Sequence, residues 1–563
     1  MEKRALLAVA LSLLILIVYQ EWASRYYPPP PPREEQREEK KPESLAAPPS
    51  PKPQPTLQEA KPPGPAKPQA AREIKVETDH YVALFTPQGA RLTSFRLKHY
   101  RTSVDEKSPP FEMIPSAPGI PYPLGVQLPG AKPFDDEGLA YSVQGSDLNL
   151  SGNNQGSFVF RGQSPTGAIV TKEFTFTGSG YAIGMQVSVE KDGALGTPAV
   201  ILSTELPKNG PKSDGLLEGF LTHLCIKPTS HALAIKGGPG FEGLLAEVGG
   251  KHIRETAEAL VGGKELTGKV SWVGFGHTYF LFALLPEEKT EQKITVKQTG
   301  PALIMEIGAQ PGTNGQARTT QTIFIGPKDL DILKGLNRGL EGSIDFGYFG
   351  FVSMPLLYVM HFSHRLTSSY GIDIILLTFL IKLLLAPLTH KSFVSMKQMQ
   401  KLQPQMERLK DKFKDDKEKL NKEIMELYRR NKVNPFGGCF PMLFQFPVFI
   451  GLYSALQTPI ELRHTPFLWI KDLSLPDCES LAMTLGSWTL GIPILTLLMG
   501  ASMFLQQWMT PSAGDPNQRR MMLMMPVVFT VMFINFPSGL TIYWLVNNVL
   551  SIGQQYLINR MEH

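Results

Sequence analysis

The chain has 563 residues with a formal net charge of +5, and charged residues make up 19 % of it. Its mean hydropathy is −0.09, which fits neither a wholly soluble enzyme nor a compact transporter and indicates a large polar part joined to apolar segments. The three cysteines, Cys225, Cys439 and Cys478, show no metal-ligand spacing. Cys225 and Cys478 could pair only if both face an oxidising compartment, and nothing in the sequence requires that pairing.

The N-terminal region combines positive charge with an apolar run. Lys3 and Arg4 precede the apolar residues 5–19, and no small-x-small cleavage site follows. This pattern favours an uncleaved anchor over residues 1–22 rather than a signal peptide, with the chain emerging on the side away from the cytoplasm. Residues 23–72 are rich in Pro, Lys and Glu, a composition that cannot bury a core. They are predicted to form an extended tether.

Residues 73–330 are dominated by alternation of apolar and polar residues. Such period-two segments, punctuated by Gly and Pro without intervening helices, predict a β-sandwich. The histidines of this region have no carboxylate partner or metal-ligand spacing beside them in the sequence, so no catalytic site or metal is expected here. The clearest predicted strands are residues 81–85, 158–160, 174–177, 181–189, 294–296 and 320–325.

From residue 331 the chain becomes strongly apolar. Residues 345–364 mix aromatic and basic side chains, as expected of a helix at the membrane interface. Five spans are predicted after it, and with the anchor they make six. Segment 391–432 carries thirteen Lys or Arg against seven Asp or Glu, so the positive-inside rule places it in the cytoplasm with both termini. The predicted spans are residues 371–388, 436–456, 490–508, 521–536 and 540–557.

The basic segment 391–432 also shows helical periodicity. Apolar residues recur at three and four positions in two runs, which predicts an antiparallel pair of amphipathic helices. Its charges are either a solvated face or a contact surface for a nascent chain, lipid headgroups or a ribosome. The pattern does not choose between these two interpretations.

Lys382 lies in an apolar run of the first predicted span after the large domain. A charge at the centre of a span costs about 2.5–3.5 kcal/mol on insertion scales, so such residues usually have a functional role. The alternative is that its long side chain snorkels to the cytoplasmic interface. A functional cation requires a water-filled recess, and Thr378, one helical turn away, is expected on the same helix face. Gln445 lies in the next span.

Several motifs together resemble the YidC membrane protein insertase family in its Gram-negative form with a large periplasmic domain. The likeness covers essentially the whole chain, and the ending of the β-domain over residues 324–329 fits it as well. Its most specific parts are residues 434–441 with Gln445, Pro447 and Leu452-Tyr453, then residues 536–540 with Tyr543, and Thr378-Phe379 and Pro387-Leu388-Thr389 on either side of Lys382.

The resemblance implies a non-enzymatic insertase and chaperone in the bacterial inner membrane that needs no cofactor, metal or nucleotide. A cationic groove would take up the polar tails of client proteins. By position, the groove residues are Lys382, Thr378 and Gln445, and the client-contacting residues are Phe446, Pro447, Met532 and Trp544. The implied partners are newly made membrane proteins, the Sec translocon, ribosomes and lipids, with no specific nucleic-acid sequence.

Two departures from the family pattern affect these expectations. Gram-negative members usually carry Arg where this chain has Lys382, and Lys pairs less well with a client carboxylate. The tail after Arg560 lacks the long basic extension that some relatives use to hold ribosomes. Direct ribosome tethering is therefore expected to be weak.

The predicted fold is thus a multi-domain membrane protein with a six-span helical part, made of a five-helix core and an anchor, and a large periplasmic β-sandwich. Two other functions fit the sequence. One is a secondary transporter or channel, which internal repeats would favour, but the sequence shows no such repeat. The other is a scaffold for other membrane complexes. The predicted organisation is an anchor (1–22), a linker (23–72), the β-domain (73–330), an interfacial lead-in (331–370), a span (371–388), a cytoplasmic hairpin (389–433), four spans (434–558) and a short tail (559–563).

Overall fold

The structure is a computed structural model that describes most of the chain from residue 72 onward. The predicted anchor and nearly all of the predicted linker lie outside the described residues. The described ranges are 72–105, 107–114, 117–128, 134–165, 167–190, 198–206, 225–228, 241–287, 291–308, 316–413, 416–431, 433, 440–485, 488–510 and 516–561.

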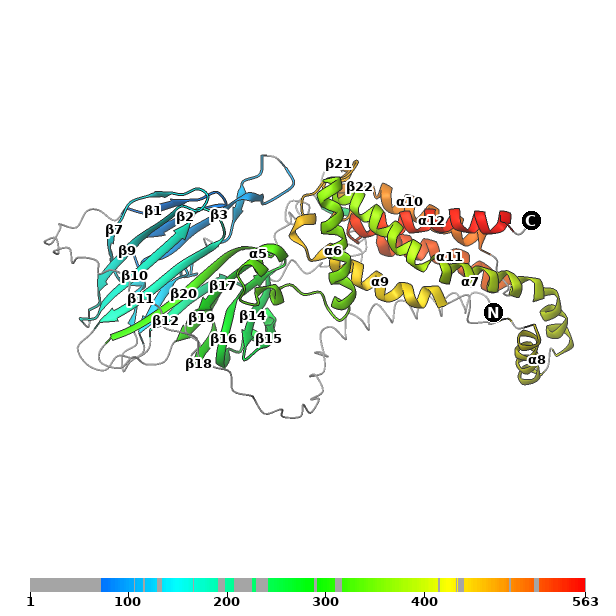
Figure 1. The fold of residues 1–563 in the computed structure, drawn as a ribbon, viewed down its shortest axis with the longest axis horizontal. Coiled ribbons are helices and arrows are strands. Elements are labelled where there is room, and N and C mark those ends of the chain that lie inside the picture. Colours follow the sequence, from blue (N-terminus) through cyan, green and yellow to red (C-terminus); the bar gives the residue numbers. More distant parts are fainter. Residues whose placement is uncertain are drawn as a thin grey trace, which may run out of the picture. The chain divides into compact units, whose positions relative to one another are not determined.

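The larger sheet of the β-rich part has fourteen strands, most of them antiparallel neighbours (Figure 1). Strand β10 (Ile169–Thr177) lies between β9 (Gln155–Gln163) and β11 (Ala182–Glu190). Along β10 and β11 every second residue is buried, because successive side chains of a strand point to opposite faces. The β-rich domain expected from the alternating pattern is confirmed.

The long strand β16 (Lys264–His277) joins two parts of this sheet. Its first half pairs with β18 (Glu291–Thr299), and its second half pairs with β17 (Phe280–Pro286) and β14 (Phe241–Val248). At the changeover, a Cβ on Gly268 would lie 2.8 Å from the Val248 side chain, so only glycine leaves room for the strand to change partners here.

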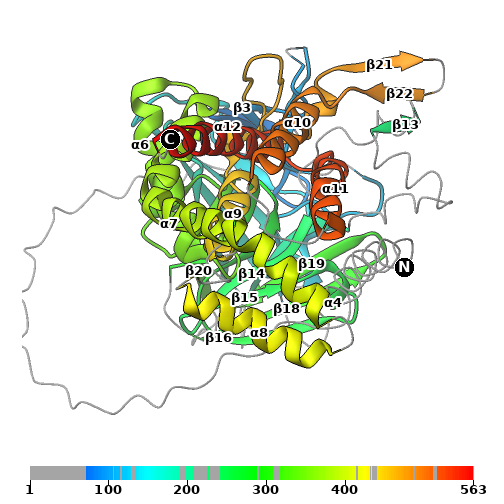
Figure 2. The ribbon, with the colours of Figure 1, turned by 90° about the vertical axis from the view of Figure 1, so that its right-hand side faces the viewer.

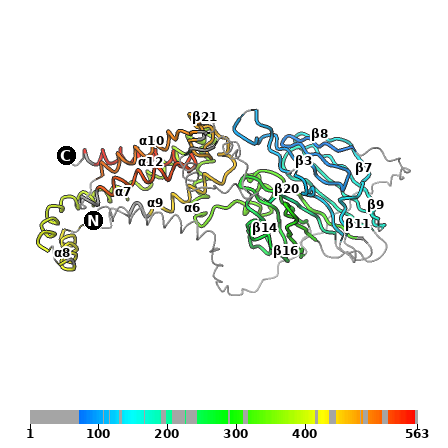
Figure 3. The backbone as a smooth tube through the Cα atoms, turned by 180° about the vertical axis from the view of Figure 1, so that it is seen from behind, coloured from blue at the N-terminus to red at the C-terminus, as the bar shows by residue number. Residues whose placement is uncertain are grey.

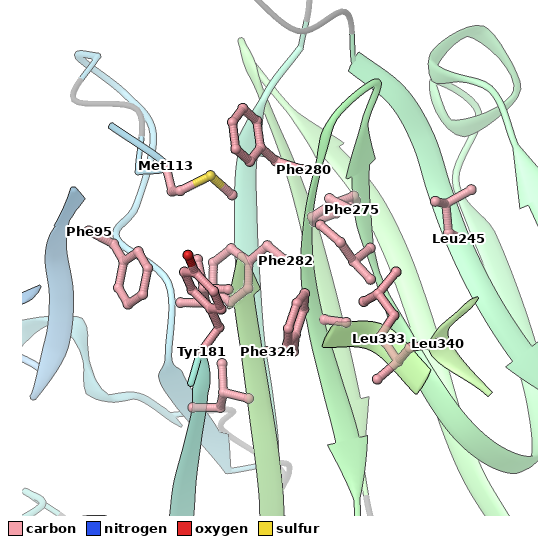
Figure 4. Close-up of a cluster of buried hydrophobic side chains, with 14 of the residues drawn as sticks. Phe95, Met113, Tyr181, Leu245, Phe275, Phe280, Phe282, Phe324, Leu333 and Leu340 are labelled. Carbon is pink, nitrogen blue, oxygen red and sulfur yellow. The ribbon is translucent and has the colours of Figure 1, made fainter. Parts of the chain in front are cut away.

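A second sheet of five strands packs face to face with the β9–β11 region. Its order is β4-β3-β2-β1-β8, and the Phe85 ring of β2 (Tyr81–Thr86) lies 4.9 Å from the Phe174 ring of β10 and 5.3 Å from the Phe158 ring of β9. Figure 4 shows the neighbouring part of this core, where Phe95, Tyr181 and Phe282 meet. Aromatic side chains from both sheets therefore fill the space between them.

The remaining strands and the short helices complete the β-rich part. They are β1 (Ile74–Glu77), β3 (Arg91–Arg101), β4 (Pro110–Glu112), β5 (Gly125–Leu128), β6 (Phe134–Asp135), β7 (Ser142–Gln144), β8 (Leu148–Asn149), β12 (Ala199–Glu205), β13 (Ile226–Pro228), β15 (Lys251–Glu255), β19 (Ala302–Gly308) and β20 (Gln316–Pro327), with helices α4 (Ala257–Leu260) and α5 (Leu330–Gly335).

The C-terminal part is helical. Helix α12 packs against both α7 and α10, and these three helices run alongside one another (Figure 3). Helix α6 packs against α7 and α9 and runs across their direction (Figure 1). A short hairpin, β21 (Ala482–Leu485) and β22 (Trp488–Gly491), precedes α10. The helices are α6 (Gly350–Thr367), α7 (Tyr370–Lys412), α8 (Lys417–Arg430), α9 (Phe440–Gln457), α10 (Ile494–Met509), α11 (Pro516–Phe533) and α12 (Ser538–Met561).

Of the helices in the described residues, α7 alone is long and apolar enough to cross a membrane when judged by length and composition. Helix α10 and residues 520–533 of α11 are shorter apolar helices. Helix α7 continues without a break through Lys412, so the first helix of the predicted basic hairpin is its extension. Helix α8 folds back on it, and the Tyr428 hydroxyl lies 3.1 Å from the Met406 sulfur.

Candidate functional site

Lys382 lies on α7 and is partly buried against α12. Its ammonium donates a hydrogen bond to the Ser551 hydroxyl at 2.6 Å, and that hydroxyl donates in turn to the Asn547 carbonyl at 2.7 Å. Both partners are neutral. No ion pair among the described residues includes Lys382, so within that part of the chain its charge is hydrogen-bonded but not neutralised.

Asp373 is the carboxylate of α7 nearest in sequence to Lys382, but it serves another contact. It lies in the first turn, fully buried, where its Oδ2 is 2.8 Å from His364 Nδ1 and its Oδ1 accepts from the Thr367 hydroxyl at 2.6 Å. Nine residues separate it from Lys382, which is about 13 Å along a helix. Asp373 therefore joins α6 to α7 and does not compensate the cation.

Gln445 and Thr378 occupy different surroundings. The Gln445 side-chain amide donates to the Tyr543 hydroxyl, which links α9 to α12. Thr378 is buried and donates to the Ile374 carbonyl of its own helix at 2.6 Å. Tyr543 and Ser551 are eight residues apart on α12, or about 12 Å along its axis. Lys382 and Gln445 thus both contact α12, but at positions about two helical turns apart along its axis.

Ser551 is the contact that sequence reasoning missed. It is buried on α12, 169 residues from Lys382, and the sequence analysis assigned it no role. Its only sequence signal is a serine one turn after Asn547 within an apolar segment. Small polar residues in such segments commonly hold neighbouring helices together, so they give no specific indication of a partner.

Other polar side chains of α12 hold it to its neighbours. The Asn548 amide donates to the Ser502 hydroxyl of α10 at 3.0 Å, and the Gln555 amide donates to the Met509 carbonyl at 2.7 Å. Gln554 donates to the Ala386 carbonyl of α7 at 3.3 Å. These bonds form a polar seam between α7, α10 and α12, of the kind that stabilises helix packing in lipid.

The residues expected to contact clients are not equivalent. Phe446 is 59 % exposed and projects from α9. Pro447 and Met532 are partly buried. The Trp544 ring lies 5.8 Å from Phe449 and 5.7 Å from Phe533, so it sits in an aromatic cluster between helices. Of the family motif over residues 434–441, residues 434–439 lie outside the described part of the chain.

The outer surfaces of these helices are apolar. Large leucine and aromatic side chains are exposed there, for example Leu384 at 77 %, Phe362 at 67 % and Trp508 at 62 %. Water-exposed proteins rarely present so much contiguous apolar surface. Helices with a polar seam inside and an apolar exterior, joined to a large β-rich part, define a membrane protein with an extramembrane domain.

Comparison with known proteins identifies the family of this chain. The model of the 60Kd inner membrane protein family matches residues 362–563, and the model of the YidC periplasmic domain matches residues 73–359. The membrane protein insertase YidC of Syntrophus aciditrophicus is 38 % identical over 100 % of this chain and 100 % of its own. That of Pelobacter propionicus is 38 % identical over 100 % of this chain and 99 % of its own.

The chain therefore belongs to the YidC membrane protein insertase family, with a periplasmic β-rich domain and a helical membrane part. It is also similar to a solved active YidC insertase with its first transmembrane domain resolved, at 18 % identity and a TM-score of 0.38 over 87 % of this chain and 93 % of that one. That last likeness is too weak to carry an argument. The resemblance drawn from the sequence motifs is confirmed.

Proposed function

We propose that this protein inserts membrane proteins into the inner membrane by receiving their polar tails at the Lys382 cation, alone or with the Sec translocon, and without nucleotide hydrolysis. The single observation that supports this best is the bonding of Lys382, a partly buried cation whose hydrogen-bond partner, Ser551, is neutral. A charge kept without a carboxylate partner remains free to attract one from a client.

The energetics follow from the cost of burying charge. A polar or acidic tail that enters hydrocarbon unaided loses its hydration, which costs several kcal/mol or more. A fixed cation on α7 lowers that cost by pairing transiently with the tail. The apolar segment of the client then partitions into lipid along the exposed apolar surface, and its hydrophobicity drives completion. No nucleotide enters this scheme.

The surrounding polar groups have proposed roles of two kinds. Thr378, one turn from Lys382, and Gln445, bonded to Tyr543 about 12 Å farther along α12, are assigned to the wall of a proposed polar recess. Phe446, whose ring is mostly exposed, and Pro447 are assigned to the client path. Met532 and Trp544 are assigned to the same client path, where the Trp544 ring packs against Phe449 and Phe533.

The proposed topology has six spans with both termini in the cytoplasm. Segment 391–432, which includes α8, carries the excess of basic residues, and the positive-inside rule favours its cytoplasmic location. The first helix of this hairpin is the continuation of α7, the helix that carries Lys382. The hairpin is the proposed contact for ribosomes and anionic lipid headgroups.

The test is insertion by the purified protein alone in liposomes. The client is a short single-span protein with an acidic tail, and protease protection of that tail is measured against empty liposomes. We expect Lys382→Glu and Lys382→Ala to lower the protected fraction at least fivefold and Lys382→Arg to retain it. Ser551→Ala is the matched control, since it removes the hydrogen bond and keeps the charge, and we expect it to retain most activity.

Two outcomes would contradict the proposal. Normal insertion by the Lys382→Glu protein would exclude the cation from the mechanism. Protection no greater than in empty liposomes, with folded protein and a competent client, would favour a scaffold or a Sec-dependent accessory instead.

A further inference from the structure

The hairpin β21–β22 presents an apolar face that nothing in the described chain covers. Its register pairs Met483 with Leu490, and the Ile492 amide continues the ladder by donating to the Leu481 carbonyl at 3.0 Å. Paired residues, and residues two apart along a strand, share one face of a sheet. Four large side chains on this face are exposed: Leu481 37 %, Met483 56 %, Leu490 40 % and Ile492 37 %.

The opposite face of the hairpin is held to the protein at Gly491 and is exposed at Ala482. It carries the small residues Ala482 and Gly491, and a Cβ on Gly491 would lie 2.4 Å from the Cys478 carbonyl oxygen. The Gly491 amide donates to the Cys225 carbonyl at 2.9 Å, and Cys225 and Cys478 form a disulfide. The large side chains therefore point away from the covered side.

Strand β13, which follows Cys225 in the β-rich domain, adds a third strand to this sheet by pairing with β22 (Figure 2). Because β13 belongs to the periplasmic domain and is hydrogen-bonded to β22, the hairpin lies on the periplasmic side of the membrane. The disulfide and the added strand fix the orientation of the exposed face.

The exposed face continues into the surface of a membrane helix. After Pro493 the chain enters α10, where Leu497 is 54 % and Leu498 is 47 % exposed. The buried Asp477 carboxylate accepts from the Leu495 amide and the Thr496 hydroxyl, both at 2.7 Å, and so fixes the first turn of α10. Ile494, between Ile492 and Leu497, is also exposed at 36 %, so exposed apolar side chains continue along the chain from the hairpin into the first turns of α10.

We propose that the apolar face of the β21–β22 hairpin lies in the outer leaflet of the inner membrane, with lipid acyl chains as its occupant. The hairpin then sets the depth of the periplasmic end of α10. Through β13 and the disulfide, it also ties one segment of the periplasmic domain to the membrane surface. The occupant is lipid because this face continues the surface that α10 presents to lipid.

Spin labels on the two faces test this placement in reconstituted liposomes. Met483→Cys and Ala482→Cys are each labelled in a Cys439→Ser background, since the other two cysteines are paired. Both positions are exposed neighbours on one strand and differ in face, so Ala482 is the matched control. We expect the ratio of oxygen to nickel-chelate accessibility to be at least threefold higher at Met483.

Equal ratios at the two positions would overturn the proposal. A Met483 label shielded from both reagents would also overturn it and would identify a protein, such as a second copy, as the occupant. The unmodified protein provides an independent measurement with lipids that carry a diazirine in the acyl chain. We expect cross-links within residues 481–492 as well as in α10, and labelling of α10 without the hairpin would refute the inference.

Discussion

Lys172 is the most completely buried cation of the β-rich domain, and its removal tests how the two sheets are joined. Its side chain on β10 is 0 % exposed and lies 2.6 Å from Asp136 Oδ2. The ammonium also donates to the carbonyls of Gly89 at 2.8 Å and Leu124 at 2.9 Å. It therefore holds the turn before β3 and the start of β5 to the middle of the larger sheet.

The substitution Lys172→Met keeps the length and apolar stem but removes the charge. Asp136 would retain Arg91 at 3.3 Å and the Tyr141 hydroxyl at 2.9 Å, while three backbone carbonyls, those of Gly89, Ala90 and Leu124, would lose their donor. Removing one partner of a buried ion pair costs about 3–5 kcal/mol. For a domain of this size, that loss corresponds to a fall in Tm of about 6–20 °C.

The assay is thermal unfolding of the full chain in detergent, followed by near-ultraviolet circular dichroism. Lys251→Met is the matched control because Lys251 is exposed on β15, and its Tm should stay within about 2 °C of the parent. Adding Asp136→Leu to Lys172→Met should deepen the loss, because buried Arg91 and the Tyr141 hydroxyl then lose the carboxylate they share. A Lys172→Met protein with the same Tm as the Lys251→Met control would refute the reasoning.

Two further predictions concern the disulfide and helix α6. The Cys225–Cys478 disulfide leaves one thiol of three, so a maleimide polymer should add once to the denatured protein without reductant and three times with it; three additions without reductant would contradict the pairing. The Glu461 carboxylate, 3.4 Å from His361 Nε2, raises the pKa of His361 against the opposing effect of burial. The stabilisation by the His361–Glu461 ion pair is therefore complete below about pH 6.5 and is lost as pH rises through the raised pKa of His361. The substitution His361→Gln should therefore flatten the pH dependence of the protection of α6 amides, measured relative to their intrinsic exchange rates. An unchanged pH dependence in that variant would remove the ion pair from the explanation.

The local pattern of the sequence determined the class of each part. Alternation over residues 174–177 and 181–189 predicted strands, and both segments lie in the paired strands β10 and β11. The apolar run around Lys382 predicted a membrane helix with a charge inside it, and α7, which carries Lys382, is long and apolar enough to cross a membrane. These features are readable because side-chain periodicity and apolar run length depend only on neighbouring residues.

The local sequence pattern did not predict the secondary structure at the start of the span expected over residues 490–508. That segment begins as β22 and becomes helical only from Ile494, after Pro493. An apolar run is consistent with either a strand or a helix. Pairing with β21 and β13 decided the outcome, and those partners are distant or separated by a turn.

Only the tertiary structure decided which residues meet. Ser551 reaches Lys382 across 169 positions, Tyr543 reaches Gln445 across 98, and Cys478 reaches Cys225 across 253. Such contacts depend on which helix faces turn toward one another and on strand register, which the whole packed chain sets at once. The sequence by itself thus determined that a cation lies within the membrane part, while the packing of α7 against α12 determined that its partner is a neutral hydroxyl.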